Sequence, residues 1–186
     1  MEIGNRAIWD VKYFCAAKAT VASGAITYAD GQQIWDTIRV SFTPNVISAA
    51  HTSETGGRKT RYKVLGGDLS IDHEPEAFET RALLFGHSVD AETGVISDNI
   101  NDLPQHVGAG FYMAMNNDTW QAVFFPYAIF SEGTEQADGA LDGVTYNTKT
   151  TTGSAEADPE GNYYKAKSFN SETEAKAWVN TMLGMN

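Results

Sequence analysis

Hydrophobic and polar residues alternate along much of this chain, which is the pattern of β-strands with one or two buried faces. The alternation is clearest in residues 107–115 and 119–130, which flank the short polar segment 116–118. Two alternating runs around such a segment predict a β-hairpin. Both faces of the two runs carry apolar side chains. We therefore expect the hairpin to be buried on both sides, in a core or at a subunit contact.

Five further runs are rich in β-branched and aromatic residues and are predicted to be strands. They span residues 6–15, 34–42, 59–73, 144–152 and 163–169. Pro44 is expected to end the second run, and Gly66-Gly67 predicts a bulge or a turn within the third. Residues 16–32 are small and polar, with an Asp30-Gly31 turn signal. They fit either a hairpin or a flexible excursion.

Residues 75–85 change to a helical pattern. Pro75 suits the first helical turn, and Gly86 is a natural stop after the last one. The residues predicted to face the core recur at helical spacing: Phe78, Ala82 and Phe85. A second helix is predicted near the C-terminus, where Ser171 and Glu174 form a capping box. Its apolar face comprises Ala175, Trp178, Val179 and Met182.

The pattern as a whole predicts a mainly β fold. We expect a β-sandwich or barrel-like structure with a short flanking helix at about 75–85 and a short C-terminal helix. The length of 186 residues suits a single domain over residues 1–186, with a C-terminal extension at 170–186. Residues 51–59 are polar and contain a glycine pair, which predicts a long exposed loop between strands.

The composition narrows the possible partners. The formal net charge is -11, so phosphate groups and anionic lipid would be repelled from most of the surface. Cys15 is the only cysteine, which excludes an internal disulfide, and its apolar surroundings predict a buried thiol. The sequence has no apolar run long enough for a transmembrane helix and no signal-peptide pattern at its start, so we expect no membrane partner and no export by that route.

Motifs of catalysis and ligand binding are missing from the sequence. None of the four histidines is paired with a second His or Cys at metal-ligand spacing: His51, His73, His87 and His106. His73 and His87 bracket the first helix and could meet in space, but we interpret them as surface or capping histidines. The Asp98–Asp102 stretch looks superficially like a calcium loop, but its spacing is not that of an EF-hand, so we interpret it as a solvated acidic turn, with a weak divalent-ion site as the alternative.

No catalytic, cofactor-binding or metal-binding residue is therefore predicted, and we do not expect an enzyme. A small hydrolase that uses a carboxylate pair is kept as an alternative, because acidic side chains are numerous. A carbohydrate-binding β-sandwich is a second alternative, which would require an exposed aromatic cluster in a groove.

An ordered set of segments carries a family likeness. The run from Ala82 to Ser88 is followed by an acidic turn with a glycine, a glycine-containing strand, an aromatic strand and a Phe-Ser-Glu step, at 90–94, 107–111, 120–125 and 130–132. In this order the segments resemble the major tail (tail-tube) proteins of long, non-contractile tailed bacteriophages. The likeness runs over residues 3–169. Phe85 departs from the family pattern, in which the leucine pair often runs directly into the glycine.

The resemblance implies a structural virion protein that assembles with itself. Its subunits would form hexameric rings that stack into a tail tube, through which the genome passes without specific binding. Tape-measure, tail-terminator and distal-tail proteins would be its partners, and it would be made in the host cytoplasm and reside in the virion tail. The polar loop at 51–59 and the N-terminal strand would be assembly elements. A tube protein of a contractile injection machine also assembles as stacked rings and is the nearest alternative.

Overall fold

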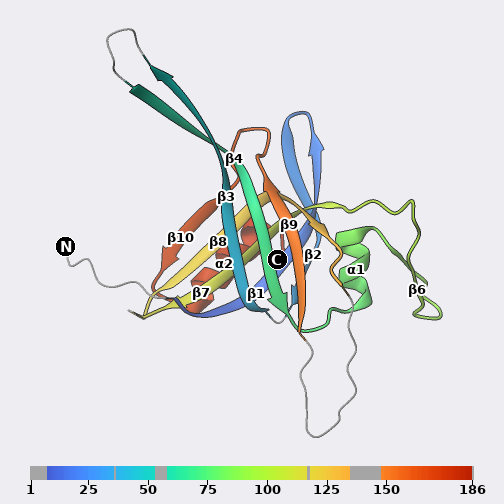
Figure 1. Cartoon of the computed structure of the whole chain (residues 1–186). Coiled ribbons are helices and arrows are strands. Elements are labelled where there is room, and N and C mark those ends of the chain that lie inside the picture. Colours follow the sequence, from blue (N-terminus) through green and yellow to red (C-terminus); the bar gives the residue numbers. More distant parts are fainter. Residues whose placement is uncertain (1–7, 36, 53–57, 117, 135–147, 186) are drawn as a thin grey trace, which may run out of the picture.

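The computed structural model of the protein describes residues 8–35, 37–52, 58–116, 118–134 and 148–185 (Figure 1). Within these ranges the chain is mainly β, which confirms the predicted fold class. The strands are β1 (Ile8–Ala22), β2 (Ala25–Trp35), β3 (Thr37–Thr52), β4 (Arg58–His73), β5 (Ser88–Val89), β6 (Ile96–Ser97), β7 (His106–Met115), β8 (Trp120–Ser131), β9 (Lys149–Glu156) and β10 (Lys165–Phe169). The helices are α1 (Phe78–Phe85) and α2 (Glu172–Met182).

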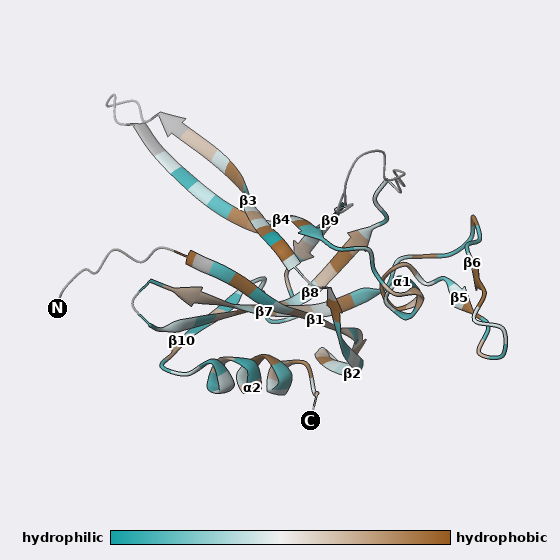
Figure 2. Ribbon diagram, turned by 90° about the horizontal axis from the view of Figure 1, so that it is seen from below, coloured by the Kyte–Doolittle hydropathy of each residue, from teal (hydrophilic) through white to brown (hydrophobic). Residues whose placement is uncertain are grey.

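One sheet contains all of these strands except the small β5–β6 hairpin. Its order is β2-β1-β7-β8-β9-β4-β3, and β10 pairs with β8. Strand β8 pairs with β10 through residues 120–124 and with β9 through residues 127–131. This change of partner lets the sheet fold over itself, so that β3, β4 and β9 lie against β1, β7 and β8 as in a sandwich (Figure 2). Helix α2 covers the other face of β1, β7 and β8.

The β7–β8 hairpin is buried on both faces, as its pattern predicted. Phe111 and Phe125 point into the sandwich and belong to the larger core cluster. Tyr112 and Phe124, on the opposite face, belong to the cluster beneath α2. Because successive side chains of a strand point to opposite faces, one hairpin supplies both cores. It is the central element of the fold.

Two glycines in β7 allow α2 and the β1–β2 hairpin to approach the sheet closely. A Cβ atom on Gly110 would lie 2.9 Å from Val179, and one on Gly108 would lie 2.5 Å from the Tyr28 ring. The predicted apolar face of α2 does pack in this cluster. The capping box is wrong, however, because Ser171 occupies the N-cap position without a side-chain hydrogen bond. The first turn is held instead by the Tyr112 hydroxyl, which donates to Glu172 over 3.0 Å.

Residues 16–32 form a hairpin and not the flexible excursion that was its alternative. The turn lies at Ser23 and Gly24, whose φ angles of 51° and 80° are typical of a two-residue β-hairpin. The Asp30-Gly31 signal marks a bulge instead, because both residues lie opposite Ala17 at a register shift between β1 and β2. Ser23-Gly24 and Asp30-Gly31 are both dipeptides that favour a left-handed backbone. Only the pairing of β1 with β2 determines which of them forms the turn and which the bulge.

Strand β3 continues through Pro44, where the sequence predicted its end. β3 lies at the edge of the sheet, and Pro44 sits beside a register shift, so the missing N–H costs no hydrogen bond that the sheet requires. Strand β4 is one bent strand, with Gly66 at the bend. The φ of Gly66 is 126°, and a Cβ atom there would lie 2.3 Å from the carbonyl oxygen of Ala155. Only glycine fits this approach of β4 to β9.

Helix α1 ends at Gly86 as predicted, in a left-handed conformation with φ of 79°. It begins at Phe78, three residues later than the pattern indicated, because the chain before it is extended and Glu76 is paired with Lys149 inside the body. The predicted core stripe is wrong in part. Phe78 is 48% exposed, and Thr80, Arg81, Leu84 and Phe85 are the buried residues.

The described bounds of the last two strands differ from those predicted. β9 begins at Lys149 and continues to Glu156, and β10 begins at Lys165, two residues after the predicted start. Residues 144–147 of the predicted strand lie outside the described residues, as do residues 1–7. No helix among the described residues is long and apolar enough to cross a membrane.

Candidate functional site

A two-stranded arm projects from the body of the protein (Figure 1). We define the arm as residues 45–52 of β3 and 58–65 of β4, which pair from Val46 with Val64 to Thr52 with Arg58. The predicted polar loop at 51–59 is therefore shorter than expected. Residues 51–52 and 58–59 belong to the strands, and residues 53–57 lie outside the described part of the chain.

One face of the arm is apolar although it is exposed. Val46 and Val64 are paired across the strands, and Tyr62 follows on the same face, opposite Ser48. Their exposed fractions are 52%, 37% and 73%. A monomeric protein rarely leaves aliphatic and aromatic side chains of one face uncovered on a projecting element. The face has the composition of an interface core.

The arm is also basic, in contrast to the rest of the chain. It contains Arg58, Lys59, Arg61 and Lys63 and no Asp or Glu. The whole chain has 13 Lys and Arg against 24 Asp and Glu, so the residues outside the arm have nine against 24, a net charge of -15. Lys63 and Arg61 lie opposite Ile47 and Ala49, on the face away from Val46. That face also carries Ile47 and Leu65, which are 53% and 52% exposed, so the positive charge of the arm lies among further apolar side chains.

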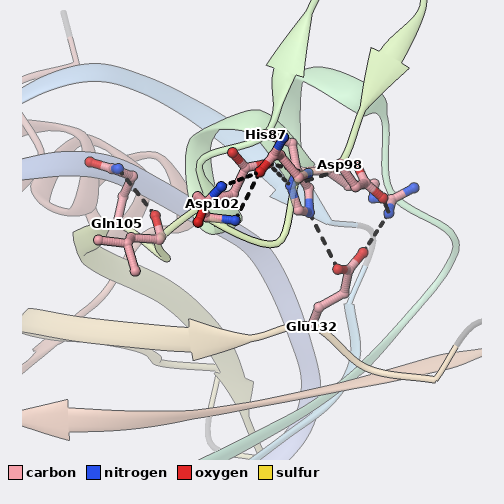
Figure 3. Close-up of polar contacts among 9 residues, drawn as sticks. His87, Asp98, Asp102, Gln105 and Glu132 are labelled. Carbon is pink, nitrogen blue, oxygen red and sulfur yellow. Dashed lines mark hydrogen bonds and ion pairs between the residues drawn. The ribbon is translucent and has the colours of Figure 1, made fainter.

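A cluster of charged side chains lies on the other side of the body, and we call it the latch (Figure 3). It joins α1, the end of β8 and the segment 88–105, which we call the flap. Its members are Arg81, His87, Asp98, Asp102 and Glu132. The left-handed Gly86 directs the chain from α1 into His87. A Cβ atom on Gly86 would lie 2.4 Å from the carbonyl oxygen of Leu103. The Gln105 N–H donates to the Leu84 carbonyl over 2.9 Å, so the flap returns onto the helix end.

Both ring nitrogens of His87 face carboxylates. Nδ1 lies 2.9 Å from Asp102 Oδ2, and Nε2 lies 3.3 Å from Glu132 Oε2. An ionised carboxylate only accepts hydrogen bonds, so this geometry calls for a protonated imidazolium. Burial by itself lowers the pKa of His87, but the hydrogen bonds to Asp102 and Glu132 and the charge of Asp98 together raise it above its usual value.

Two carboxyl groups of the latch, those of Asp102 and Glu132, are held ionised. Hydrogen bonds from His87 and from the Asn99 N–H lower the pKa of Asp102. Burial raises the pKa of Glu132, but Arg81 and His87 outweigh that effect and lower it. A glycosidase needs one carboxyl group that stays protonated to act as the acid. Neither Asp102 nor Glu132 has the raised pKa that the acid of a glycosidase requires.

A metal ion is a less suitable occupant of the latch than the protein's own cations. Ligand atoms of His87, Asp98 and Glu132 lie within 4.8 Å of one another, a spacing that an ion can bridge. The guanidinium of Arg81 already bonds to Asp98 over 2.8 Å and also to Glu132. Two cationic side chains thus face three carboxylates. We interpret the latch as a set of ion pairs that holds the flap on the body.

This arrangement corrects two expectations. Asp98 and Asp102 do not form a merely solvated turn, because both are turned toward Arg81 and His87. His73, expected at the surface or at a helix cap, is fully buried and contacts Thr151, Glu76 and the Glu74 carbonyl, in a cluster separate from that of His87. The buried thiol predicted for Cys15 is confirmed, and burial raises its pKa to about 12. No local motif marks Arg81 and Glu132 as partners, because they lie 51 residues apart.

A groove with aromatic walls opens between β3 and the β7–β8 hairpin. Its volume is about 340 Å³, and it is lined by Val40, Phe42, Phe111, Met113, Val123, Phe125, Tyr163 and Tyr164. Tyr164 is 40% exposed. The groove offers two tyrosine hydroxyls as its side-chain hydrogen-bonding groups.

No protein-family model matches the chain, and no curated protein matches it in sequence.

The pH dependence of stability should reveal the latch. His87 has a raised pKa in the folded state, so its contribution is complete below the unfolded value of about 6.5 and is lost as the pH rises through the folded value. We expect His87→Gln to lower the melting temperature at pH 6 more than at pH 8.5. The control His106→Gln removes a partly exposed histidine outside the latch. An equal loss at both pH values for His87→Gln would show that its imidazole is not charged.

Proposed function

We propose that this protein is the subunit of a tail tube of a long-tailed bacteriophage, a structural virion protein that assembles into stacked rings. The observation that carries the proposal is the arm. It is a paired hairpin with an apolar face and four basic residues, attached to an otherwise acidic body. Such an element costs solubility in a monomer but provides both hydrophobic and electrostatic contacts in a polymer.

The edges of the sheet support assembly into rings. The sheet is open, with β2 at one edge and β3 at the other. Open edges expose unpaired backbone groups, and closure of several copies into a ring would satisfy them. The ordered segments from 82 to 132 that resemble tail-tube proteins contribute independent support from the sequence.

The outer face of the β3-β4-β9 layer is suited to line the channel of such a tube. Its side chains point away from the core and are mostly hydroxyls and carboxylates: Ser41, Asp68, Ser70, Asp72, Thr150, Thr152 and Ser154. Thr150 and Asp72 are hydrogen-bonded to each other over 2.6 Å. Arg39 is the basic residue on this face. Neutral hydroxyls and carboxylates hold phosphates weakly, so DNA would slide past them.

A carbohydrate-binding function is the second candidate, because the aromatic groove at Tyr163 and Tyr164 supplies the surface that it needs. Sugars stack on aromatic rings but also require several hydrogen bonds. The groove provides few polar groups for them. It therefore fits an apolar segment better than a glycan.

Negative-stain electron microscopy of the purified protein at increasing concentration tests the proposal. We expect rings at intermediate concentration and tubes at high concentration. A protein that stays monomeric at every concentration would overturn the proposal. Binding to a glycan array by that monomer would then favour the carbohydrate-binding candidate.

A further inference from the structure

The flap, residues 88–105, is an exposed surface with an unusual combination of side chains. Val95, Ile100 and Leu103 are 56%, 100% and 73% exposed. Four acidic residues lie among them, at positions 90, 92, 98 and 102, and the flap has no Lys or Arg. The flap belongs to a longer stretch, residues 82–148, that contains no Lys or Arg either. Its surface is therefore apolar and negative.

The flap is held in one conformation although it is exposed. Asp90 Oδ1 accepts hydrogen bonds from the N–H groups of Glu92 and Thr93, and the Asp90 N–H donates to the Val95 carbonyl. The latch anchors its second half through Asp98 and Asp102. A surface that is ordered before it binds loses little conformational entropy on binding. Exposed aliphatic side chains on such a surface are typical of a binding site.

The flap and the arm project from opposite sides of the body (Figures 1 and 2). They therefore cannot meet within one copy of the chain. Two different surfaces that are complementary and lie on opposite sides produce a head-to-tail contact between copies, which repeats along a polymer or closes into a ring.

We propose that the flap of one copy is the docking surface for the arm of a second copy. This inference rests on the proposed self-assembly and names the partner surface of the arm. The apolar face of the arm, with Val46, Tyr62 and Val64, covers Ile100 and Leu103 of the flap. Arg61 and Lys63 lie on the reverse face of the arm, and their positive charge steers the approach to the acidic flap.

Complementation between two variants of the full chain tests the contact. The flap variant Ile100→Ser/Leu103→Ser retains its arm, and the arm variant Val46→Thr/Tyr62→Thr/Val64→Thr retains its flap. We expect neither variant alone to form tubes at the concentration at which the unaltered protein does. Mixed in equal amounts they should form a complex, because the intact arm of the first can bind the intact flap of the second. Analytical ultracentrifugation of the two variants and of their mixture measures this.

The control is Phe78→Ser, which removes an exposed apolar side chain from α1, outside the arm, the flap and the sheet edges, and should leave assembly unchanged. Circular dichroism and thermal unfolding establish that each variant is folded. Normal tubes from the folded flap variant, or no complex in the mixture, would overturn the inference while the proposed function stands. Absence of assembly by the unaltered protein would overturn both.

Discussion

The triple substitution Val46→Thr/Tyr62→Thr/Val64→Thr should raise the concentration needed for polymerisation by on the order of 100-fold while the subunit stays folded. These side chains are exposed in the single subunit, so their replacement removes little from its own stability. In a polymer each would be covered, and losing the burial of each apolar group costs about 1 kcal/mol. Threonine keeps the β-branched shape that favours strands, so the arm itself should persist.

Light scattering after size-exclusion chromatography at several concentrations measures the effect of the arm variant. High salt offers a second readout, because screening weakens the contribution of the basic residues and leaves the apolar contribution in place. We expect added salt to raise the concentration needed for polymerisation more for the unaltered protein than for Lys63→Ser, which has one basic residue fewer. Tubes that form at the usual concentration from the triple variant would exclude the arm as an assembly element.

Replacing Lys149 with methionine should destabilise the subunit by about 3–5 kcal/mol, the usual cost of leaving a buried charge without its partner. Lys149 Nζ lies 2.6 Å from Glu76 Oε1, and the two side chains are 9% and 2% exposed. The pair connects the start of β9 to the segment before α1. His73, whose pKa burial lowers, lies 3.8 Å from the other carboxylate oxygen of Glu76.

The double variant Glu76→Met/Lys149→Met is the matched control for this prediction. With both charges gone, most of the lost stability should return, because apolar side chains of similar volume replace the pair. At pH 5.5 Lys149→Met should lose less stability than at pH 8, since a protonated His73 can neutralise Glu76. Urea denaturation of the three proteins at pH 5.5 and pH 8 provides the comparison. Equal stability of Lys149→Met and the unaltered protein would mean that the pair contributes nothing.

Local patterns were sufficient where an element depends on its own residues. The β7–β8 hairpin followed from two alternating runs around a polar turn, and both of its faces are buried as the alternation indicated. Gly86 ended α1 because glycine adopts the left-handed conformation after a helix at little cost. The apolar face of α2 was likewise visible in the spacing of its residues.

Local patterns failed where the outcome depends on a strand's neighbours. Pro44 ends a central strand but is tolerated at an edge, and the position of β3 in the sheet is not encoded near Pro44. The Asp30-Gly31 pair has the chemistry of a turn, yet the chain turns at Ser23 and Gly24 because β1 and β2 pair in that register. Phe78 depends in the same way on what lies around it. Its spacing suits a core, but α1 packs on the body by other residues and Phe78 faces solvent.

The charged clusters belong wholly to the tertiary structure. Glu76 and Lys149 are 73 residues apart, and Arg81 and Glu132 are 51 apart, so no motif could connect them. The sequence by itself determined that the chain is acidic, mainly β and without a recognisable catalytic motif. Folding decided that a basic, apolar arm and an acidic, apolar flap lie on opposite sides of one body. Strand pairing sets such positions through contacts between distant residues, and these contacts leave no periodic trace along the chain.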